Sequence, residues 1–405
     1  MNAVSDKNVL VVNCGSSSVK FAIVDPADGH VYVSGLAEAL GLEDARISWA
    51  FDGEKKTETE LGAGAGHDKA IEFIVATILA GHDELLASLK AVGHRIVSGG
   101  ELYSQPTLVD DSVVAGIEKC IPFAPLHNPA HVLGIKAARK AFSSIPHVCI
   151  FDTAFHQTMP DYAYRFAIPE EYYTENGIRR YGAHGTSHYY VAGEAAKELG
   201  FDATDFNVIT CHMGNGASVS AVKNGKCLDT SMGLTPLDGL MMGTRSGAID
   251  ASVMFFLCDN LKLTPNEVSV ILNKKSGLLG ISGKTSDFRG ITEGYLEGDK
   301  KCTLAFEMFC YRLAKFIASY YVPLGRVDAI VFTGGIGENS FLMRKRVLEW
   351  LAPFGVKIDL EKNEKARVFM GGRGIISAAD SSCKVTVIPT NEELVIARQA
   401  AEFAK

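Results

Sequence analysis

Three glycine-containing turns follow apolar runs in this chain, and each offers groups that bind phosphate. The first, NCGSSS at 13–18, is followed by Lys20, so a glycine, three hydroxyls and an ammonium lie close together. The others are HMGNG at 212–216 and GGIGEN at 334–339. Glycine allows close backbone approach, and backbone N–H groups bind phosphate. A serine-rich hairpin turn explains the first equally well, and Walker A spacing is absent. Together, however, the three turns favour a phosphate-binding cleft.

Two arginines lie in segments rich in glycine and serine rather than on charged helical faces. Arg95 stands in GHRIVSGGE and Arg245 in MMGTRSG. A guanidinium group matches two oxygens of a carboxylate or phosphate, and it stabilises the charge of a phosphoryl group in transfer. The alternative is a loop arginine in a structural ion pair. The surroundings favour a fixed anionic target for both side chains.

Two carboxylates are candidates for holding a divalent cation. Asp152 ends the apolar run VCIF, and Glu392 lies in PTNEEL. Mg²⁺ prefers one or two carboxylates together with water and phosphate oxygens. Thr390 and Glu393 have the spacing of a capping box, which assigns Glu393 to the start of a helix. Glu392 is then left to face the site.

His184 and His188 have the spacing of a zinc pair, but the glutamate of the H-E-x-x-H motif is absent. The intervening Gly-Thr indicates that a loop ends and a helix is capped there, which would separate the two rings. We therefore expect His184 to donate a hydrogen bond to an anion and His188 to be structural.

The composition is that of an ordinary folded protein. Of 405 residues 47% are hydrophobic and 21% charged, and this length predicts two or three domains. Forty Lys and Arg against 47 Asp and Glu give a net charge of -7 with no basic block, which argues against nucleic-acid and anionic-membrane partners. Nine scattered cysteines without a C-x-x-C pair favour a reducing cytoplasm. The start of the chain lacks a secretory pattern, and no apolar run reaches the ~18 residues of a membrane span.

The elements that would position these residues follow an α/β pattern. A strand, polar glycine turn and strand occur twice, about 200 residues apart, which suggests two related domains. The predicted strands are 8–12, 19–24, 148–152, 207–210, 218–222, 227–230, 328–333 and 385–390. The predicted core helices are 68–89 and 303–321.

Ten segments in order resemble the acetate kinase family over nearly the whole chain: NCGSSSVKF, GHRIVSGGE, FAPLHNPAH, FDTAFHQTMP, RRYGAHGTSH, CHMGNGASV, MGTRSG, SGLLGISG, FTGGIGEN and PTNEELVIA. The resemblance implies transfer of the γ-phosphoryl group of ATP to acetate, giving acetyl phosphate and ADP, with Mg²⁺ or alternatively Mn²⁺. It implies an α/β fold of two duplicated ribonuclease-H-like domains, as in actin and the heat-shock ATPases, with the active site in the interdomain cleft. A cytoplasmic homodimer is expected.

Motif order then predicts the domain limits. The first domain takes 1–150 plus 386–405, because PTNEEL must return to the phosphate end that NCGSSS begins, and the second takes 151–385.

The resemblance also implies a role for individual residues. The implied catalytic residues are Asp152, His184, Arg95 and Arg245. Acetate would contact Arg95, Val97, Leu126, Ala183 and Pro236, and the metal would be held by Asn13 and Glu392. The implied nucleotide-binding residues are Ser16, Ser18, Lys20, His212, Asn215, Gly216, Asp287, Phe288, Arg289, Gly335, Ile336 and Asn339.

The chain departs from the family pattern at two positions, where Ser98 replaces a usual histidine and Ala248 a usual aspartate. Ala183 stands where many members carry phenylalanine, and the smaller side chain is expected to enlarge the acyl pocket and permit propionate. A propionate or butyrate kinase is therefore the nearest alternative. An actin-like or chaperone-like nucleotide switch is the alternative from another class.

Overall fold

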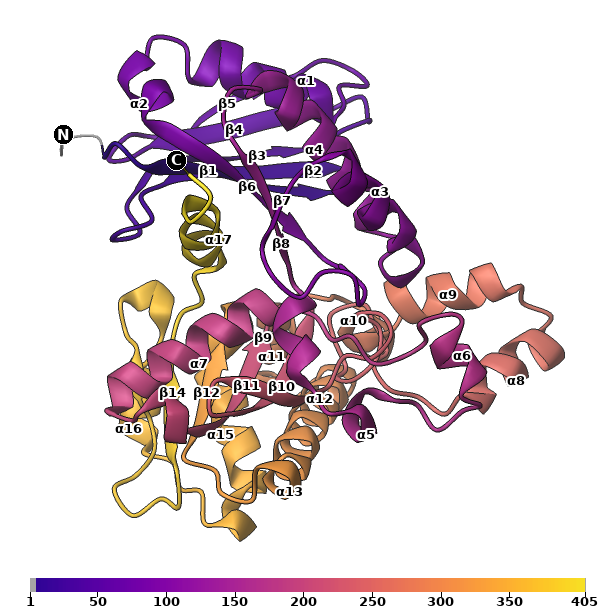
Figure 1. Ribbon diagram of the computed structural model, residues 1–405. Helices are drawn as coiled ribbons and strands as arrows, with labels where there is room; N and C mark the ends of the chain where they lie inside the picture. The colour runs from indigo at the N-terminus through magenta and orange to yellow at the C-terminus, as the bar shows by residue number, and fades with distance from the viewer. Residues whose placement is uncertain (1–4, 405) are drawn as a thin grey trace. The chain divides into compact units, whose positions relative to one another are not determined.

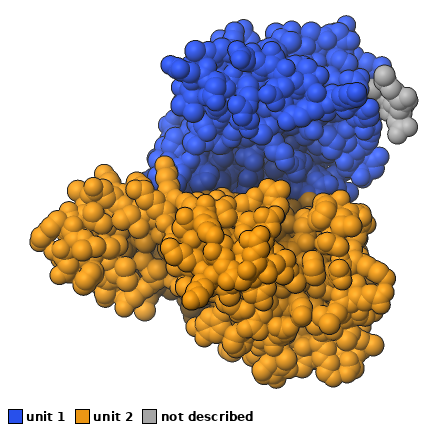
Figure 2. Space-filling model, turned by 180° about the vertical axis from the view of Figure 1, so that it is seen from behind, with its two compact units in different colours: residues 1–154, 391–405 blue, residues 155–390 orange. Residues whose placement is uncertain are grey.

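The computed structural model of the chain describes residues 5–404, which form two compact units (Figure 2). Unit 1 contains the residues up to Ala154 and those from Asn391 onward, and unit 2 contains Phe155–Thr390. The limits predicted from the motifs, 150 and 385, lie close to these. Residues 1–4, on which part of the argument against a secretory signal rests, lie outside the described residues, as does Lys405.

Unit 1 is built on a sheet with the strand order β5-β4-β3-β2-β1-β6-β8-β7 (Figure 1). Strands β1 to β5 form an antiparallel meander, β6 and β8 run parallel to β1, and β7 pairs antiparallel with β8. The strands are β1 (Asn8–Gly15), β2 (Ser18–Val24), β3 (Val31–Glu38), β4 (Arg46–Phe51), β5 (Thr57–Glu60), β6 (Leu89–Ile96), β7 (Thr107–Leu108) and β8 (His147–Phe151).

Helices cover both faces of this sheet, which explains why β1 is a continuous apolar run rather than an alternating one. Leu10 and Val12 pack in the cluster that includes Ile71 of α1 and Ala138 of α4, whereas Val9 and Val11 pack with Ile396 of α17. The helices of unit 1 are α1 (His67–Phe73), α2 (Asp83–Ser88), α3 (Asp111–Lys119), α4 (Asn128–Ala141) and α17 (Glu392–Ala401).

The single helix predicted at 68–89 is wrong. A π-helical turn at Ile74–Ile78 follows α1, and the chain then bends before α2 begins at Asp83. Gly81 adopts a φ of 78°, a left-handed conformation that glycine accepts without strain and that ends a helix. The apolar periodicity continued through this break, and sequence alone therefore joined the two helices.

Unit 2 repeats the central topology of unit 1. Its strand order is β11-β10-β9-β12-β14-β13: an antiparallel meander of three strands rather than five is followed, as in unit 1, by two strands parallel to the first and an antiparallel edge strand. The strands are β9 (Asn207–Met213), β10 (Ala217–Lys223), β11 (Lys226–Thr230), β12 (Ala329–Thr333), β13 (Gly374–Ile375) and β14 (Lys384–Val387). The predicted hairpins and the duplicated ribonuclease-H-like architecture are confirmed.

The helices of unit 2 include α12, which confirms the core helix predicted at 303–321. Its buried side chains Phe309, Leu313 and Ile317 pack against the sheet cluster. The helices are α5 (Asp161–Tyr164), α6 (Glu171–Thr174), α7 (Gly185–Leu199), α8 (Ser252–Leu261), α9 (Pro265–Lys274), α10 (Gly277–Ser282), α11 (Phe288–Leu296), α12 (Lys300–Ser319), α13 (Tyr321–Leu324), α14 (Gly334–Asn339), α15 (Phe341–Trp350) and α16 (Leu360–Lys365).

All nine cysteines are free thiols, and eight of them are buried. Burial raises the pKa of the Cys14 thiol to about 12, which keeps it protonated and unreactive beside the first glycine turn. Between Ser5 and Ala404, no helix has the length and apolar character needed to cross a membrane.

Candidate active site

The first glycine turn connects β1 to β2 and gathers four of the predicted phosphate and metal ligands of unit 1. Asn13 pairs with Lys20 across the antiparallel ladder, and Gly15 pairs with Ser18, so Ser16 and Ser17 form the turn itself. The Lys20 ammonium extends to the first turn of α17, where it forms an ion pair with Glu393. The hairpin therefore presents hydroxyls and an ammonium near the start of α17.

Arg95 lies near the carboxyl end of β6 and is held by two carboxylates. Its Nη2 and Nε donate to Oδ2 of Asp152 at 2.7 and 3.1 Å, and Nε lies 3.4 Å from Oε2 of Glu392. Asp152 follows β8, the parallel neighbour of β6, and Glu392 begins α17, so the sheet order brings the three together. Burial acts to lower the pKa of Arg95, but the charges of Asp152 and Glu392 outweigh it and raise that pKa. Arg95 is thus a fixed, permanently charged group.

The capping box predicted for Thr390 and Glu393 is wrong. The residue at the N-cap is Asn391, whose Oδ1 accepts a hydrogen bond from the backbone N–H of Leu394 at 2.9 Å. Glu393 pairs with Lys20 instead, and the Thr390 hydroxyl lies 2.8 Å from Oγ of Ser187. Asparagine is among the strongest N-cap residues, and the N-cap of α17 is therefore Asn391, one residue after the predicted Thr390.

The charges at this end of unit 1 fit a bound cation. Three carboxylates, those of Asp152, Glu392 and Glu393, face two cationic groups, those of Arg95 and Lys20. Burial and the nearby Asp152 charge raise the pKa of Glu392, although Arg95 opposes them. Over residues 5–404, no group of three His, Cys, Asp or Glu side chains could hold a metal ion. A metal here would therefore take few protein ligands and complete its shell with water and phosphate oxygens.

In unit 2, His184, Arg245 and the turn after β9 converge on one point. A Cβ atom at Gly216 would lie 3.3 Å from Nε2 of His184 and 3.5 Å from Nη1 of Arg245, so only glycine leaves this space open. Nη1 of Arg245 donates to the carbonyl of Pro236 at 3.2 Å. Among the described residues no carboxylate pairs with Arg245, and burial lowers its pKa. A half-buried cation without a counter-charge is suited to an anionic ligand.

The predicted phosphate turn packs directly on the loop that carries Arg245. The backbone N–H of Gly243 donates to the carbonyl of Asn215 at 3.0 Å. A Cβ atom at Gly243 would lie 1.9 Å from Oδ1 of Asn215, a distance that no side chain permits. A larger residue at 243 would force the Asn215 side chain to move, so glycine lets HMGNG and MMGTRSG meet with Asn215 in its present position.

The expectation that His184 and His188 are separated is wrong. His184 is the residue before α7 and adopts a left-handed φ of 56°, which turns its ring toward the sheet. Nδ1 of His184 and Nε2 of His188 each lie 2.8 Å from Oγ of Ser218. The His212 ring packs on that of His184 with centroids 4.3 Å apart. The helix begins where predicted, but a serine of β10 joins the two rings.

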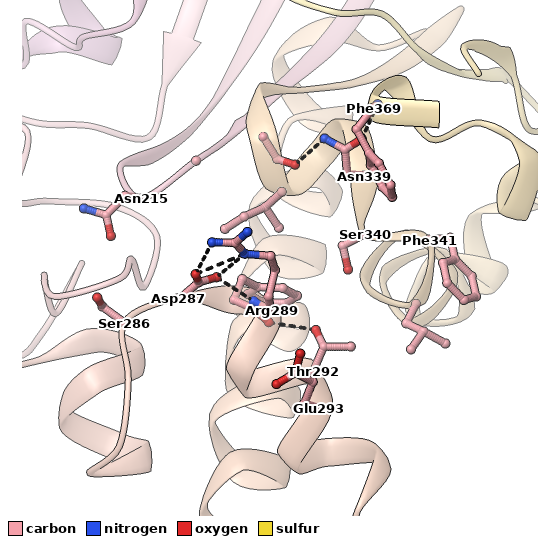
Figure 3. Close-up of a pocket in the computed structure, with 15 residues that line it drawn as sticks. Asn215, Ser286, Asp287, Arg289, Thr292, Glu293, Asn339, Ser340, Phe341 and Phe369 are labelled. Carbon is pink, nitrogen blue, oxygen red and sulfur yellow. Dashed lines mark hydrogen bonds and ion pairs between the residues drawn. The ribbon is translucent and has the colours of Figure 1, made fainter. Parts of the chain in front are cut away.

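A pocket of about 890 Å³ lies within unit 2 (Figure 3). Asn339 is locked in its wall, because its Oδ1 accepts from the Phe369 backbone N–H and its Nδ2 donates to the Gly335 carbonyl, both at 2.9 Å. Arg289 and Asp287 form an ion pair at 2.6 Å near the centre of the view. Seven predicted nucleotide ligands line this pocket: Asn215, Asp287, Phe288, Arg289, Gly335, Ile336 and Asn339.

The sequence-based prediction of the residues that line this pocket is incomplete. His212 and Gly216 belong to the same turn as Asn215 but do not line the pocket. The lining residues that it missed are Gly214, Ser286, Thr292, Glu293, Ser340, Phe341, Leu342 and Phe369. Apart from the glycine of HMGNG, these residues lie outside recognisable motifs. The signal for Phe369 is weak, an aromatic residue before the glycine-rich segment GGRG.

Comparison with known proteins decides the family. The profile of the acetokinase family matches residues 8–398. The chain belongs to the acetokinase family. Proteins named acetate kinase from Shewanella loihica and Shewanella frigidimarina are 57% and 59% identical to it over 401 and 399 residues. These alignments cover 99% and 98% of this chain, and 100% and 99% of the relatives.

Solved structures of acetokinase-family proteins have the same fold. A propionate kinase from Francisella tularensis is 43% identical, with a TM-score of 0.92, over 98% of this chain and 100% of the other. Porphyromonas gingivalis acetate kinase is 42% identical, with a TM-score of 0.92 and the same coverage.

The four positions expected to line the acyl pocket of an acetokinase-family enzyme are divided between the units. Val97 and the half-exposed Leu126 belong to unit 1, and Pro236 belongs to unit 2. Ala183, also in unit 2, packs in the hydrophobic core, and its carbonyl lies 2.9 Å from Nε2 of His156. Their grouping around a methyl group stays a prediction.

The two departures from the acetokinase pattern have local structural partners. The Ser98 hydroxyl accepts from the backbone N–H of Gly100 at 3.3 Å. At the other departure, Arg312 donates to the carbonyls of Ser246 and Ala248, each at 3.2 Å. Backbone carbonyls thus hold Arg312 beside the Arg245 loop, where no carboxylate side chain stands at 248.

Proposed function

We propose that this chain is an acetate kinase, which transfers the γ-phosphoryl group of ATP reversibly to acetate by direct in-line attack. The observation that carries the proposal is the convergence of His184 and the unmatched cation Arg245 on Gly216. These groups are suited to the charge that spreads over a phosphoryl group during transfer. Relatives named acetate kinase at 57% and 59% identity support the acceptor.

In the proposed mechanism the protein aligns charges and supplies no general base, because an acetate carboxylate is ionised at neutral pH and is itself the nucleophile. Arg95 would bind the carboxylate, held in one orientation by Asp152 and Glu392. Arg245 and His184 would donate to the phosphoryl oxygens. The position of the active site between the two domains stays a prediction.

Family membership implies ATP as substrate together with a divalent metal. We propose Mg²⁺, with Mn²⁺ as the alternative, held by Glu392 and Asn13 and oriented by Asp152. The surplus of negative charge among Asp152, Glu392 and Glu393 supports this assignment. When bound, the metal would neutralise phosphate charge. The adenosine would occupy the pocket lined by Asp287, Ile336 and Asn339, and its phosphates would extend to the Asn215 turn.

Acyl phosphates are trapped by hydroxylamine, which tests the reaction directly. We expect hydroxamate from acetate with ATP and Mg²⁺, a smaller yield from propionate, and the least from butyrate. A methylene group discriminates by only about 1–3 kcal/mol, so propionate is expected to react measurably. Propionate exceeding acetate would support the alternative of a propionate kinase. No hydroxamate from any acid, with ATP still bound, would overturn the kinase and support a nucleotide switch.

We also propose that the protein forms a homodimer through α8. None of the ten residues of α8 is buried, and Phe255 and Phe256 are 67% and 59% exposed. Contiguous exposed apolar surface of this kind is typical of protein interfaces. Light scattering of wild type should give twice the mass of one chain, and Phe255→Glu with Phe256→Glu should give the single mass. A monomeric wild type would contradict the proposal.

A further inference from the structure

A buried polar layer lies between α7 and the β9–β10 hairpin, directly behind His184. Strand register places Thr210 opposite Ser220 and His212 opposite Ser218, so all four side chains share one face of the sheet. Farther along α7 the same face is apolar, with Val191 and Ala195 packed on Val208. Burying a polar group costs free energy unless it is hydrogen-bonded, so each polar side chain of this layer is expected to have a hydrogen-bond partner.

One chain of hydrogen bonds runs through this layer to His184. Oγ1 of Thr210 lies 2.7 Å from Nδ1 of His188, and Nε2 of His188 lies 2.8 Å from Oγ of Ser218. Oγ of Ser218 lies 2.8 Å from Nδ1 of His184. Thr210, His188 and Ser218 each have no solvent exposure. Burial, with smaller contributions from His156 and His212, lowers the pKa of His188 far below its ordinary value, so this ring is neutral.

The chain of hydrogen bonds has a direction, because a hydroxyl group and a neutral imidazole ring each carry one proton that can be donated. Among the described residues, Nδ1 of His188 is the one hydrogen-bond partner of the Thr210 side chain. If His188 carried its proton on Nδ1, the buried Thr210 hydroxyl proton would have no acceptor. Thr210 therefore donates to Nδ1, His188 donates from Nε2 to Ser218, and Ser218 donates to Nδ1 of His184.

We propose that Thr210, His188 and Ser218 are positioning residues that hold His184 as the neutral Nε2–H tautomer, with its donor facing the space at Gly216. Neutral His184 then donates at any pH at which the enzyme is folded, without first becoming an imidazolium. The catalytic meaning of this arrangement rests on the proposed kinase reaction. The tautomer itself does not, and it can be measured in the resting protein.

Other titratable groups face His184 and must be kept constant in any pH experiment. His212 of β9 packs on its ring, His188 lies behind it on α7, and Arg245 approaches the same Gly216 space. His156 packs on His188 with ring centroids 5.8 Å apart. The variants below leave these groups in place.

The first test is the tautomer of His184 by nitrogen NMR of the full-length protein with isotope-labelled histidine, assigned with a His184→Gln variant. We expect a protonated Nε2 and an unprotonated Nδ1 at about pH 8, well above the ordinary imidazole pKa of about 6.5. A proton on Nδ1 would overturn the proposal. This measurement needs no substrate, so its outcome is separate from that of the hydroxamate assay.

The second test removes the donor at the far end of the chain. Thr210→Val replaces the hydroxyl with a methyl group of similar size, so the direction of the hydrogen bonds through His188 and Ser218 is no longer fixed. In molecules with the reversed direction, Nε2 donates only when the ring is protonated. We expect kcat at about pH 8.5 to fall by about 10–100-fold, which is less than the roughly 10²–10³-fold loss caused by removing one transition-state donor entirely. Below about pH 6.5, where the ring becomes protonated, kcat should recover.

Two matched variants complete this test. Thr210→Ser restores the hydroxyl and should restore the wild-type pH profile. Ser220→Ala deletes a buried hydroxyl from the same strand as Ser218, one that contacts Thr230 at 2.8 Å and none of the histidines. It should leave the profile unchanged. An equal loss of kcat at every pH in Thr210→Val, or the same new pH limb in Ser220→Ala, would overturn the proposal.

Discussion

The two units each supply one arginine to the proposed chemistry, but they balance its charge in opposite ways. In unit 1, Arg95 is paired with Asp152 and Glu392, and carboxylates outnumber cations. In unit 2, Arg245 contacts carbonyl oxygen and sulfur but no carboxylate among the described residues. The carboxylates of unit 1 suit a metal and fix the orientation of Arg95, whereas Arg245 in unit 2 keeps its charge available for phosphate. Removing either arginine should therefore lower activity, but the two removals should have different consequences for stability.

Arg95→Ala should have the largest combined effect. We expect kcat to fall by about 10³-fold or more, by analogy with other phosphoryl-transfer arginines. The free energy of unfolding should also fall by about 3 kcal/mol, because the Asp152 carboxylate, only 1% exposed, loses the positive charge of Arg95. Turnover assays and urea denaturation measure the two effects. Arg95→Ala combined with Asp152→Asn should recover stability but not activity, and unchanged stability of the single variant would show that the Arg95–Asp152 pair does not stabilise unit 1.

Arg245→Ala should lower kcat by a similar factor, about 10³-fold or more, without the loss of stability. No described carboxylate depends on Arg245, so the melting temperature should remain at or above that of wild type. Calorimetry beside turnover assays measures this, and Arg245→Lys controls for charge without the planar fork. Near-normal turnover in folded Arg245→Ala would remove this residue from the mechanism.

Glu392→Gln should mainly affect the metal requirement. It removes one of the three carboxylates near Arg95, so we expect the Mg²⁺ concentration for half-maximal activity to rise by about 10-fold or more. A titration of activity with Mg²⁺ at saturating ATP measures this. Glu393→Gln is the matched control and should have a smaller effect, because Glu393 is already paired with Lys20. Equal effects of the two variants would contradict the assignment of Glu392.

The smallest expected effect concerns His131, a buried residue of α4. Burial, and secondarily the charge of Arg95, lowers the pKa of His131 from 6.5 to about 3. The unfolded ring takes up a proton below about pH 6.5 while the folded ring does not, so stability is lost as pH falls toward 3. Between about pH 7 and pH 4.5, the free energy of unfolding of His131→Leu should fall by about 2 kcal/mol less than that of wild type. Parallel pH curves from urea denaturation would show that His131 does not contribute.

Sequence patterns predicted the elements that depend on local chemistry. The hairpins follow from β-branched runs interrupted by glycine turns, and HMGNG and MGTRSG were recognisable because close backbone packing requires glycine. The partner of Arg95 was not predictable in this way. Asp152 and Glu392 are far from it in the chain, and only the parallel pairing of β6 with β8 and the return of α17 bring them together.

The wrong N-cap arose from competition between adjacent residues for one role. Asn391 displaced Thr390 from the N-cap, which released Glu393 to pair with Lys20. The link between His184 and His188 was missed for another reason, because Ser218 joins the two rings from a different strand. Such outcomes depend on three-dimensional partners that a linear pattern does not contain.

The packing of α17 on the sheet of unit 1 has a consequence for the synthesis of the protein. Ile396 and Ala400 cover an apolar face formed by Val9, Ala91 and Val148, residues translated much earlier. Unit 2 is contiguous in sequence and can fold as soon as its last strand leaves the ribosome. The first unit to be translated is therefore the last to be completed, and that face stays uncovered until α17 emerges. Nascent chains should bind chaperones there from the emergence of β8 until that of α17.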